Sequence, residues 1–246
     1  MGKPRLEVFL MKELIVMVHG FNARASQFND FKTWFEECGY EARAIELSTA
    51  CNSLKDCTAE LEQKLENLFE DKKIQKESIK VHLIGHSMGG LIIKKYLNHN
   101  LIKGFLESNQ GVKAKLGKVI LIATPNQGSK MADIVCQYMK PLTKIYQPLL
   151  DLQTTDFQLE HPQMAEEIEI GVIAGNKSNI ISGLLLEGEN DGRVTVSSAR
   201  VPSMQDMVVL PLGHKKIHRS PKTFQLVIHF LEKGSFTSEG KGLVDC

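Results

Sequence analysis

The sequence lacks an excess of charge of either sign, and it lacks long runs of like charges. Its 30 Lys and Arg residues stand against 29 Asp and Glu residues, which leaves a formal net charge of +1 at pH 7. A nucleic-acid-binding arm or an acidic tail usually contains about five or six like charges in a row. We therefore expect no nucleic-acid partner.

Long apolar runs are also lacking. The apolar stretch Leu14–Val18 runs directly into His19 and Gly20, which makes it too short for the hydrophobic region of a secretory signal peptide. A transmembrane helix needs roughly 18 or more apolar residues in succession, and no stretch of the sequence approaches that length. We therefore expect a cytoplasmic protein.

Cysteine and metal-ligand patterns are sparse. The five cysteines are an odd number, with no CxxC pair and no histidine at the spacing of zinc ligands. In a cytoplasmic protein we expect reduced thiols, although Cys51 and Cys57 are close enough in sequence to pair if the protein were exported. A dinucleotide fingerprint and a P-loop are lacking too. We therefore expect no cofactor and no metal.

What the sequence does contain is a regular alternation of two patterns. Short apolar runs rich in β-branched residues alternate with segments of helical period, which is typical of a parallel sheet with crossover helices. The predicted strands are Leu14–Val18, Ala42–Glu46, Ile79–Ile84, Lys118–Ile122, Ile168–Ala174 and Met207–Leu210. The alternation predicts an α/β protein with a mostly parallel, doubly wound sheet and helices on both faces.

Two segments are predicted to be helices from their apolar stripes. One apolar stripe runs from Leu54 to Leu68, and another closes the chain after Ser220 and Pro221, which suit the N-cap and first turn of a helix. No repeat, low-complexity segment or linker divides the chain. A length of 246 residues fits one domain, so we expect residues 1–246 to form a single domain.

Residues 126–167 interrupt the alternation. They show no strand signal, and apolar residues repeat at helical spacing on either side of Pro141. This pattern predicts a helical cap or lid over one end of the sheet, which would bind a lipidic or short-chain acyl group and could touch a membrane surface transiently. The alternative is a pair of helices that only pack against the core.

The strongest motif is Gly85-His86-Ser87-Met88-Gly89-Gly90, which matches G-x-S-x-G. A predicted strand precedes it and a helical stripe, Leu91 to Leu97, follows it. A serine hydroxyl is a weak nucleophile, so it must be exposed on a sharp turn where a base can reach it. Glycines two residues before and after Ser87 permit such a turn. The motif therefore predicts Ser87 as a catalytic nucleophile rather than part of a plain glycine-rich turn.

A serine nucleophile needs two N–H donors for the oxyanion of its tetrahedral intermediate. In proteins with this type of elbow, one donor is the residue after the serine and the other lies in an early strand-to-helix loop. These are the backbone N–H groups of Met88 and of Phe21, which follows His19-Gly20 at the end of the first predicted strand. We expect His19 to order that loop by hydrogen bonding rather than to act as a base.

The triad acid should follow the serine in the chain, and the base should follow the acid. The candidate aspartates after Ser87 include Asp133, Asp151, Asp156, Asp191 and Asp206. The first three fall in the predicted insertion and the last opens a strand. Asp191 lies in a glycine-rich loop, where such a sheet presents functional groups, although an ordinary Asp-Gly turn is the alternative. Glu189 is the second choice.

The base must come from the remaining histidines, which are His99, His161, His214, His218 and His229. His229 falls inside the closing helix, where a packing role is expected. His214 follows the last predicted strand in a short loop, which is where a base could reach both Ser87 and Asp191. His218 shares that loop, so position alone leaves both histidines open.

These motifs together resemble the lipase-like α/β hydrolases, in particular bacterial lipases related to the GPI inositol-deacylase-like group. The similarity covers nearly the whole chain and is densest in four blocks: the HGF turn, GHSMGG, ATPNQGS at Ala123–Ser129, and Gly171 to Phe236. The resemblance implies the α/β-hydrolase fold. It also implies that the aspartate before Gly-x-Val, Asp191, is the acid and that the histidine opening H-x-x-I-x-x-S-P, His214, is the base.

The chain departs from this pattern in two respects. Lys215 and Lys216 follow the histidine where small or apolar residues are common in the family, and they bring positive charge near the site. Many relatives also carry export signals or longer N-termini. The compartment and the substrate are therefore less closely constrained by the resemblance than the chemistry is.

The resemblance implies a serine esterase or lipase that cleaves a small-molecule or lipid ester through an acyl-enzyme intermediate. An acyltransferase or a thioesterase could use the same triad. A non-catalytic binding protein of this fold is a third hypothesis, but such proteins usually lose a triad member, and Ser87, Asp191 and His214 are all present.

Overall fold

The computed structural model of the chain describes residues 12–69, 79–102, 114–130, 132–133, 151, 168–178 and 186–236. Most of the predicted cap, residues 126–167, therefore lies outside the described residues. Within the described ranges, no helix has the length and apolar character needed to cross a membrane. Cys38, Cys51 and Cys57 are free thiols, so the pairing considered for Cys51 and Cys57 is not made.

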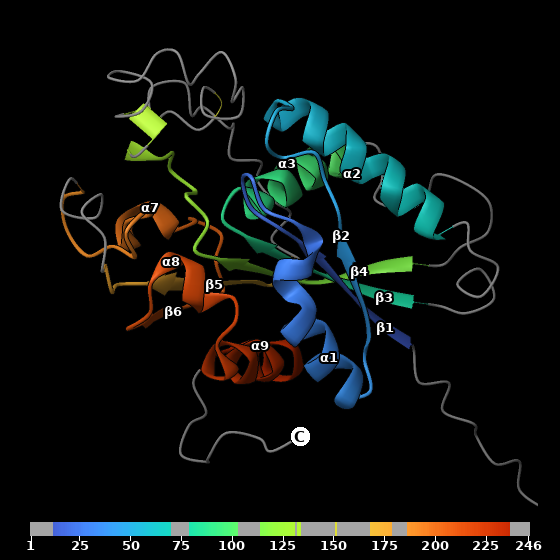
Figure 1. The fold of residues 1–246 in the computed structure, drawn as a ribbon. Coiled ribbons are helices and arrows are strands. Elements are labelled where there is room, and N and C mark those ends of the chain that lie inside the picture. Colours follow the sequence, from blue (N-terminus) through green and yellow to red (C-terminus); the bar gives the residue numbers. More distant parts are fainter. Residues whose placement is uncertain are drawn as a thin grey trace, which may run out of the picture.

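The core of the fold is a six-stranded sheet, and every neighbouring pair of its strands is parallel (Figure 1). The strand order is β2-β1-β3-β4-β5-β6. The strands are β1 Lys12–Val18, β2 Glu41–Ile45, β3 Ile79–His86, β4 Ala114–Ile122, β5 Ile170–Gly175 and β6 Asp206–Leu210. All six predicted strands and the predicted parallel sheet are confirmed, with ends that differ by a few residues.

Helices cover both faces of this sheet. In Figure 1, α2 and α3 lie on one face and α1 and α9 on the other. The described helices are η1 Ala25–Phe28, α1 Asn29–Glu37, α2 Leu54–Phe69, α3 Met88–Ile102, α7 Val196–Ala199, α8 His214–Ile217 and α9 Pro221–Lys233. Pro221 opens α9 as predicted, but the Ser220 side chain makes no capping hydrogen bond.

The strands read as continuous apolar runs because both of their faces are buried. Along β1, Leu14, Val16 and Val18 belong to the apolar cluster that includes α2 and α3 residues. Ile15 and Met17 point the opposite way and belong to the cluster formed with α1 and α9. Successive side chains of a strand point to opposite faces, so one short run supplies both cores.

The strand order reverses between β1 and β3. The chain passes from β1 outward to β2 on one side, and from β3 outward to β4 on the other. Val18 and Gly85 are paired in register, so the carboxyl ends of β1 and β3 lie side by side. Such a switch point opens a crevice between the two following loops, which is where open α/β sheets bind ligands.

Described residues at the start of the predicted cap, such as Asn126, contact the main fold, and so does Asp151. The Asp151 carboxylate accepts a hydrogen bond of 2.6 Å from the backbone N–H of Leu54, the first residue of α2. The first N–H groups of a helix have no partner within the helix, and a carboxylate there also suits the helix dipole. Asp151 therefore fixes its part of the chain to the N-terminus of α2.

Candidate active site

Ser87 occupies a sharp turn between β3, which ends at His86, and α3, which begins at Met88. Its φ angle is 54°, in the left-handed region that non-glycine residues seldom adopt. Such a conformation costs on the order of 1–3 kcal/mol and persists only where the surroundings fix it. Here the Ser87 N–H donates to the carbonyl of Ile122, 2.9 Å away on β4. The turn has the sharp geometry that the motif predicts.

The glycines of the motif are required by close backbone approach. A Cβ atom at Gly85 would lie 2.4 Å from the Cα of Gly90, and one at Gly89 would lie 2.1 Å from the carbonyl oxygen of Val18. The start of α3 is therefore pressed against the end of β1. This contact sets the distance between the elbow and the loop that follows β1.

We expect Gly89→Ala to destabilise the fold by about 3 kcal/mol, because the added methyl group meets rigid backbone rather than a side chain that can move. This loss should exceed the gain in helix propensity from alanine. Urea unfolding measures the change. Gly39→Ala is the comparison. A Cβ atom added at Gly39 would meet no other atom within 4 Å, so only the positive φ of 84° should cost stability there, by about 1 kcal/mol. Equal losses in the two variants would contradict the close contact at Gly89.

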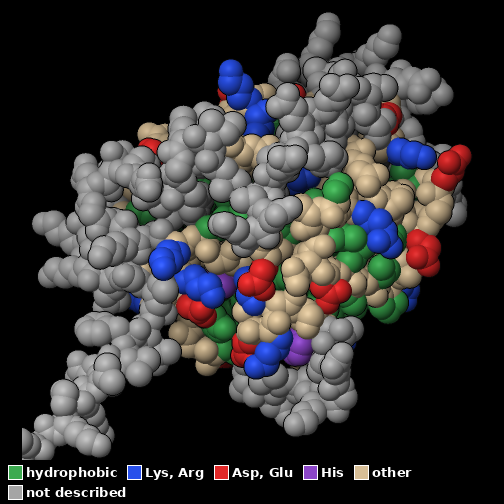
Figure 2. All heavy atoms as spheres, turned by 180° about the vertical axis from the view of Figure 1, so that it is seen from behind, with side chains coloured by type: hydrophobic (Ala, Val, Ile, Leu, Met, Phe, Trp, Pro, Cys, Tyr) green, Lys and Arg blue, Asp and Glu red, His purple; other side chains and the backbone are tan. Residues whose placement is uncertain are grey.

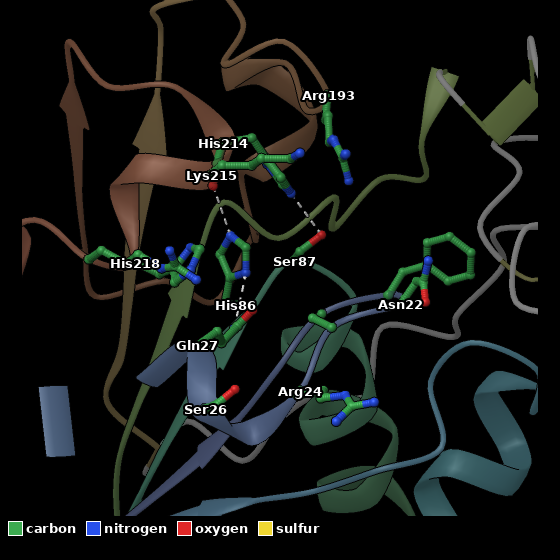
Figure 3. A pocket seen from close by; sticks show the side chains of 14 residues that line it. Asn22, Arg24, Ser26, Gln27, His86, Ser87, Arg193, His214, Lys215 and His218 are labelled. Atoms are coloured by element: carbon green, nitrogen blue, oxygen red, sulfur yellow. Dashed lines mark hydrogen bonds between the residues drawn. The ribbon is translucent and has the colours of Figure 1, made fainter. Parts of the chain in front are cut away.

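Ser87, His214 and Asp191 form a continuous hydrogen-bonded chain, and Figure 3 shows its Ser87–His214 bond. His214 Nε2 lies 3.1 Å from Ser87 Oγ, and His214 Nδ1 lies 2.8 Å from Asp191 Oδ2. Because a carboxylate only accepts hydrogen bonds, Nδ1 carries the proton and Nε2 presents its lone pair to the serine hydroxyl. The arrangement can remove a proton from Ser87 and stabilise the resulting imidazolium.

The loop that holds Asp191 is built to fix its carboxylate. Asp191 is 3% exposed, and its Oδ1 accepts hydrogen bonds from the backbone N–H groups of Arg193 at 3.0 Å and Val194 at 2.8 Å. The backbone carbonyl of Asp191 in turn accepts from the N–H of His214 at 2.9 Å. Asp191 and His214 are therefore held together by backbone as well as by side chains.

The rival residues occupy other positions. Among the hydrogen bonds between described residues, none joins His218 to Ser87 or Asp191; its ring packs edge-on against Phe28 and beside His86. The Glu189 carboxylate is exposed and accepts a bond from Asn176, so it does not contact the base. The structure brings His214 and Asp191 to the serine and leaves the two alternatives outside the hydrogen-bonded chain.

The loop after β1 lies directly against the elbow. A Cβ atom at Gly20 would lie 3.0 Å from the Cβ of Ser87, and Phe21 lines the same cavity as Ser87. Buried His19 orders this loop: its Nε2 accepts from Leu47 N at 2.9 Å, which leaves Nδ1–H to donate to Gly20 O at 3.0 Å. With both ring nitrogens engaged, His19 matches the ordering role expected from the sequence.

His86 and Gln27 form a support that the sequence did not reveal. His86 Nε2 donates to the carbonyl of His214 at 3.1 Å, and its Nδ1 accepts from Gln27 Nε2 at 3.3 Å (Figure 3). The His86 ring is packed against both His214 and His218. Burial and the neighbouring His218 hold the pKa of His86 well below its usual value. It therefore stays neutral and positions the backbone of His214.

His218 should make the fold sensitive to acid. Burial, with Arg219 and His214 nearby, lowers the pKa of His218 from 6.5 to about 4. The unfolded chain thus binds a proton that the folded chain excludes, so stability is complete above pH 6.5 and falls as the pH drops from 6.5 toward 4. At about pH 5 the expected loss from this residue is about 2 kcal/mol.

The measurement is urea unfolding at pH 7 and pH 5 for the native protein and for His218→Phe. Phenylalanine keeps a ring against Phe28 but cannot titrate. The loss of stability between the two pH values should be smaller in the variant by about 2 kcal/mol. An identical loss in both proteins would mean that His218 is not the group responsible.

A cavity of about 540 Å³ opens over Ser87 and His214. It is also lined by four cationic residues, Arg24, Arg193, Lys215 and Arg219. Of these four residues, only Lys215 was predicted from the sequence to bring positive charge near the site. Arg193 lies two residues after Asp191, so its proximity could have been noticed, whereas nothing in the spacing of Arg24 or Arg219 indicates that they reach the same cavity.

Comparison with known proteins adds to this geometry. Residues 11–166, more than half of the chain, match the family model of the serine aminopeptidases, S33. The matched range contains Ser87 and ends before Asp191 and His214. A comparison with curated proteins finds no match.

Several solved structures share the fold. The mature form of the lipase BlEst2 from Bacillus licheniformis has a TM-score of 0.72 at 26% identity, over 94% of this chain and 96% of that one. Phospholipase PlaB from Legionella pneumophila has a TM-score of 0.65 at 15% identity, over 91% of this chain and 60% of PlaB. The metagenomic carboxyl esterase MGS0156 has a TM-score of 0.64 at 17% identity, over 88% and 69%. The last two comparisons concern the fold alone.

Proposed function

The chain belongs to the serine aminopeptidase S33 family, and from this premise we propose that it is a carboxylic ester hydrolase with Ser87 as nucleophile, His214 as base and Asp191 as acid. The observation that carries the proposal is the hydrogen-bonded chain from Ser87 through His214 to Asp191. Ester hydrolysis agrees with the fold shared with a lipase at 26% identity. The substrate is then a small-molecule or lipid ester.

The reaction begins when His214 Nε2 accepts the Ser87 proton and Ser87 Oγ bonds to the ester carbonyl carbon. Asp191 holds the imidazole in the required tautomer and stabilises its positive charge. The backbone N–H groups of Phe21 and Met88 bind the oxyanion, supported by the close approach of the loop after β1 to the elbow. The alcohol leaves with the proton from His214, and water then attacks the acyl-enzyme.

The cavity favours esters over peptides with a free amino terminus. An aminopeptidase must hold the positively charged terminal amine of its substrate, usually with a carboxylate. Among the described residues that line the cavity there is no carboxylate, and Arg193 and Lys215 would repel an ammonium group. The Asp191 carboxylate is already engaged by His214 and two backbone N–H groups.

The test compares p-nitrophenyl esters of graded acyl length with an aminoacyl p-nitroanilide, each with and without an added alcohol acceptor. We expect hydrolysis of the esters, an initial burst of p-nitrophenol from acyl-enzyme formation, and little turnover of the anilide. Preferred transfer to the alcohol would instead indicate an acyltransferase. Faster turnover of a p-nitrophenyl thioester would indicate a thioesterase, and no turnover of any substrate would favour a binding protein.

A further inference from the structure

Positive charge converges on the cavity from three separate segments of the chain. Arg24 follows the Phe21 loop after β1, and Arg193 belongs to the loop that holds Asp191. Lys215 and Arg219 come from α8 and the turn that follows it, next to His214. The three segments that surround the Ser87 elbow therefore each supply a cation to the space above Ser87.

No carboxylate neutralises these cations among the described residues. The ion pairs between described residues involve none of the four, and all four side chains belong to exposed residues. Three acidic residues on the same segments or beside them have other partners: Glu46 accepts from the backbone N–H of Ala25, Glu187 pairs with Lys130, and Glu189 accepts from Asn176. The cavity thus keeps its positive charge.

This charge is local rather than a property of the whole protein. The formal net charge of the chain is only +1. On the face seen from behind in Figure 2, basic and acidic side chains of the described residues are interspersed. Figure 3 shows Arg193 and Lys215 beside His214, close to Ser87. A concentration of one sign in a concave site focuses the field on whatever enters it.

We propose that the site selects esters that carry a negatively charged group, a phosphate or a carboxylate, near the scissile bond. The inference rests on the proposed ester hydrolysis and names its substrate class. Arg193 and Lys215 are the residues placed to discriminate, because they lie beside His214 and an uncharged ester offers them no opposite charge. Arginine forks and lysine ammonium groups both bind phosphate and carboxylate oxygens.

The anionic group can lie in the acyl part or in the alcohol part of the ester, and paired substrates distinguish the two. The acyl pair is mono-p-nitrophenyl adipate against p-nitrophenyl hexanoate. The alcohol pair is butyryl glycerol phosphate against monobutyrylglycerol. In at least one pair we expect kcat/KM to be about tenfold higher for the anionic ester, since each exposed cation contributes modestly and the cavity adds their effects. No preference in either pair would overturn the proposal.

Variants locate the origin of the preference. The ratio of anionic to uncharged kcat/KM should fall about threefold in Arg193→Gln and about tenfold in Arg193→Gln with Lys215→Gln. The backbone N–H of residue 193 that holds Asp191 remains in both variants. Lys216→Gln is the matched control: Lys216 is exposed on the same short helix but does not line the cavity. An equal fall in the Lys216 variant would show that the preference is not set within the cavity.

Salt and direct binding separate this inference from the proposed function. Raising the salt from 0.1 M to 1 M shortens the screening length from about 10 Å to about 3 Å, so the preference should shrink toward unity. Binding of both substrate pairs to Ser87→Ala, measured by calorimetry, does not depend on turnover. Tighter binding of the anionic member of either pair supports the anion site even if no ester is cleaved, and equal binding within both pairs overturns it even if all four esters are cleaved.

Discussion

Replacing Ser87 by alanine is expected to lower kcat for ester hydrolysis by about 10³-fold or more, because the members of a triad act as a unit. The substitution removes only the Oγ atom, 3.1 Å from His214 Nε2. Alanine and serine tolerate the φ of 54° about equally, so the elbow should keep its shape. Initial rates on a p-nitrophenyl ester, with far-UV circular dichroism as a test of folding, measure the effect.

Ser203→Ala is the matched control for this experiment. Ser203 is exposed in the turn before β6, does not line the cavity, and its loss should leave the rate within about twofold of the native value. If Ser87→Ala retained the native rate, another nucleophile would have to carry the reaction.

Asp191→Asn is expected to lower kcat by about 10³- to 10⁴-fold while leaving the fold intact. Asp191 Oδ1 accepts from two backbone N–H groups, so the oxygen of asparagine must remain there. The amide nitrogen then faces His214 Nδ1, which can only accept from it. The proton moves to Nε2, and His214 loses the lone pair that should receive the Ser87 proton.

This reversal of the tautomer gives the variant a signature besides its rate. Nitrogen NMR of His214 should show the proton on Nδ1 in the native protein and on Nε2 in Asp191→Asn. Asp30→Asn is the control, since Asp30 is exposed in the first turn of α1 and contacts neither residue. Native activity in Asp191→Asn would be evidence that Glu189 or another carboxylate is the acid.

Much of the architecture could be predicted because strands that are buried on both faces of a parallel sheet have a recognisable sequence pattern. Runs such as Leu14–Val18 are apolar throughout, and their alternation with helical stripes indicates a parallel sheet but not the order of its strands. The predicted strand begins at Lys118, and the earlier start of β4 at Ala114 was missed because Lys115 and Gly117 are not apolar. Lys118 itself is buried, and its ammonium group pairs with Glu169 and donates to the Phe230 carbonyl.

Some residues of the candidate site could likewise be predicted from sequence patterns, and others could not. The elbow around Ser87 has a spacing imposed by backbone contacts, so it can be recognised in a sequence. Position alone could not separate His214 from His218, because the two residues are only four apart, at the start and just after the end of α8. Only the fold determines which of the two side chains points toward Ser87. Gln27 and Arg24 reach the site from the segment after β1. No local sequence pattern predicts that these two residues lie close to Ser87 and His214.

The central claim is that Ser87 is the activated nucleophile, and labelling with a fluorophosphonate tests it most directly. Such a probe bonds to a serine whose hydroxyl is deprotonated by a neighbouring base and leaves a phosphonyl group on its Oγ. Mass spectrometry of the digested protein should locate one adduct, on the peptide that contains Ser87, and the adduct should be absent from Ser87→Ala. A native protein that remained unlabelled, or that carried the adduct on another residue, would contradict the assignment.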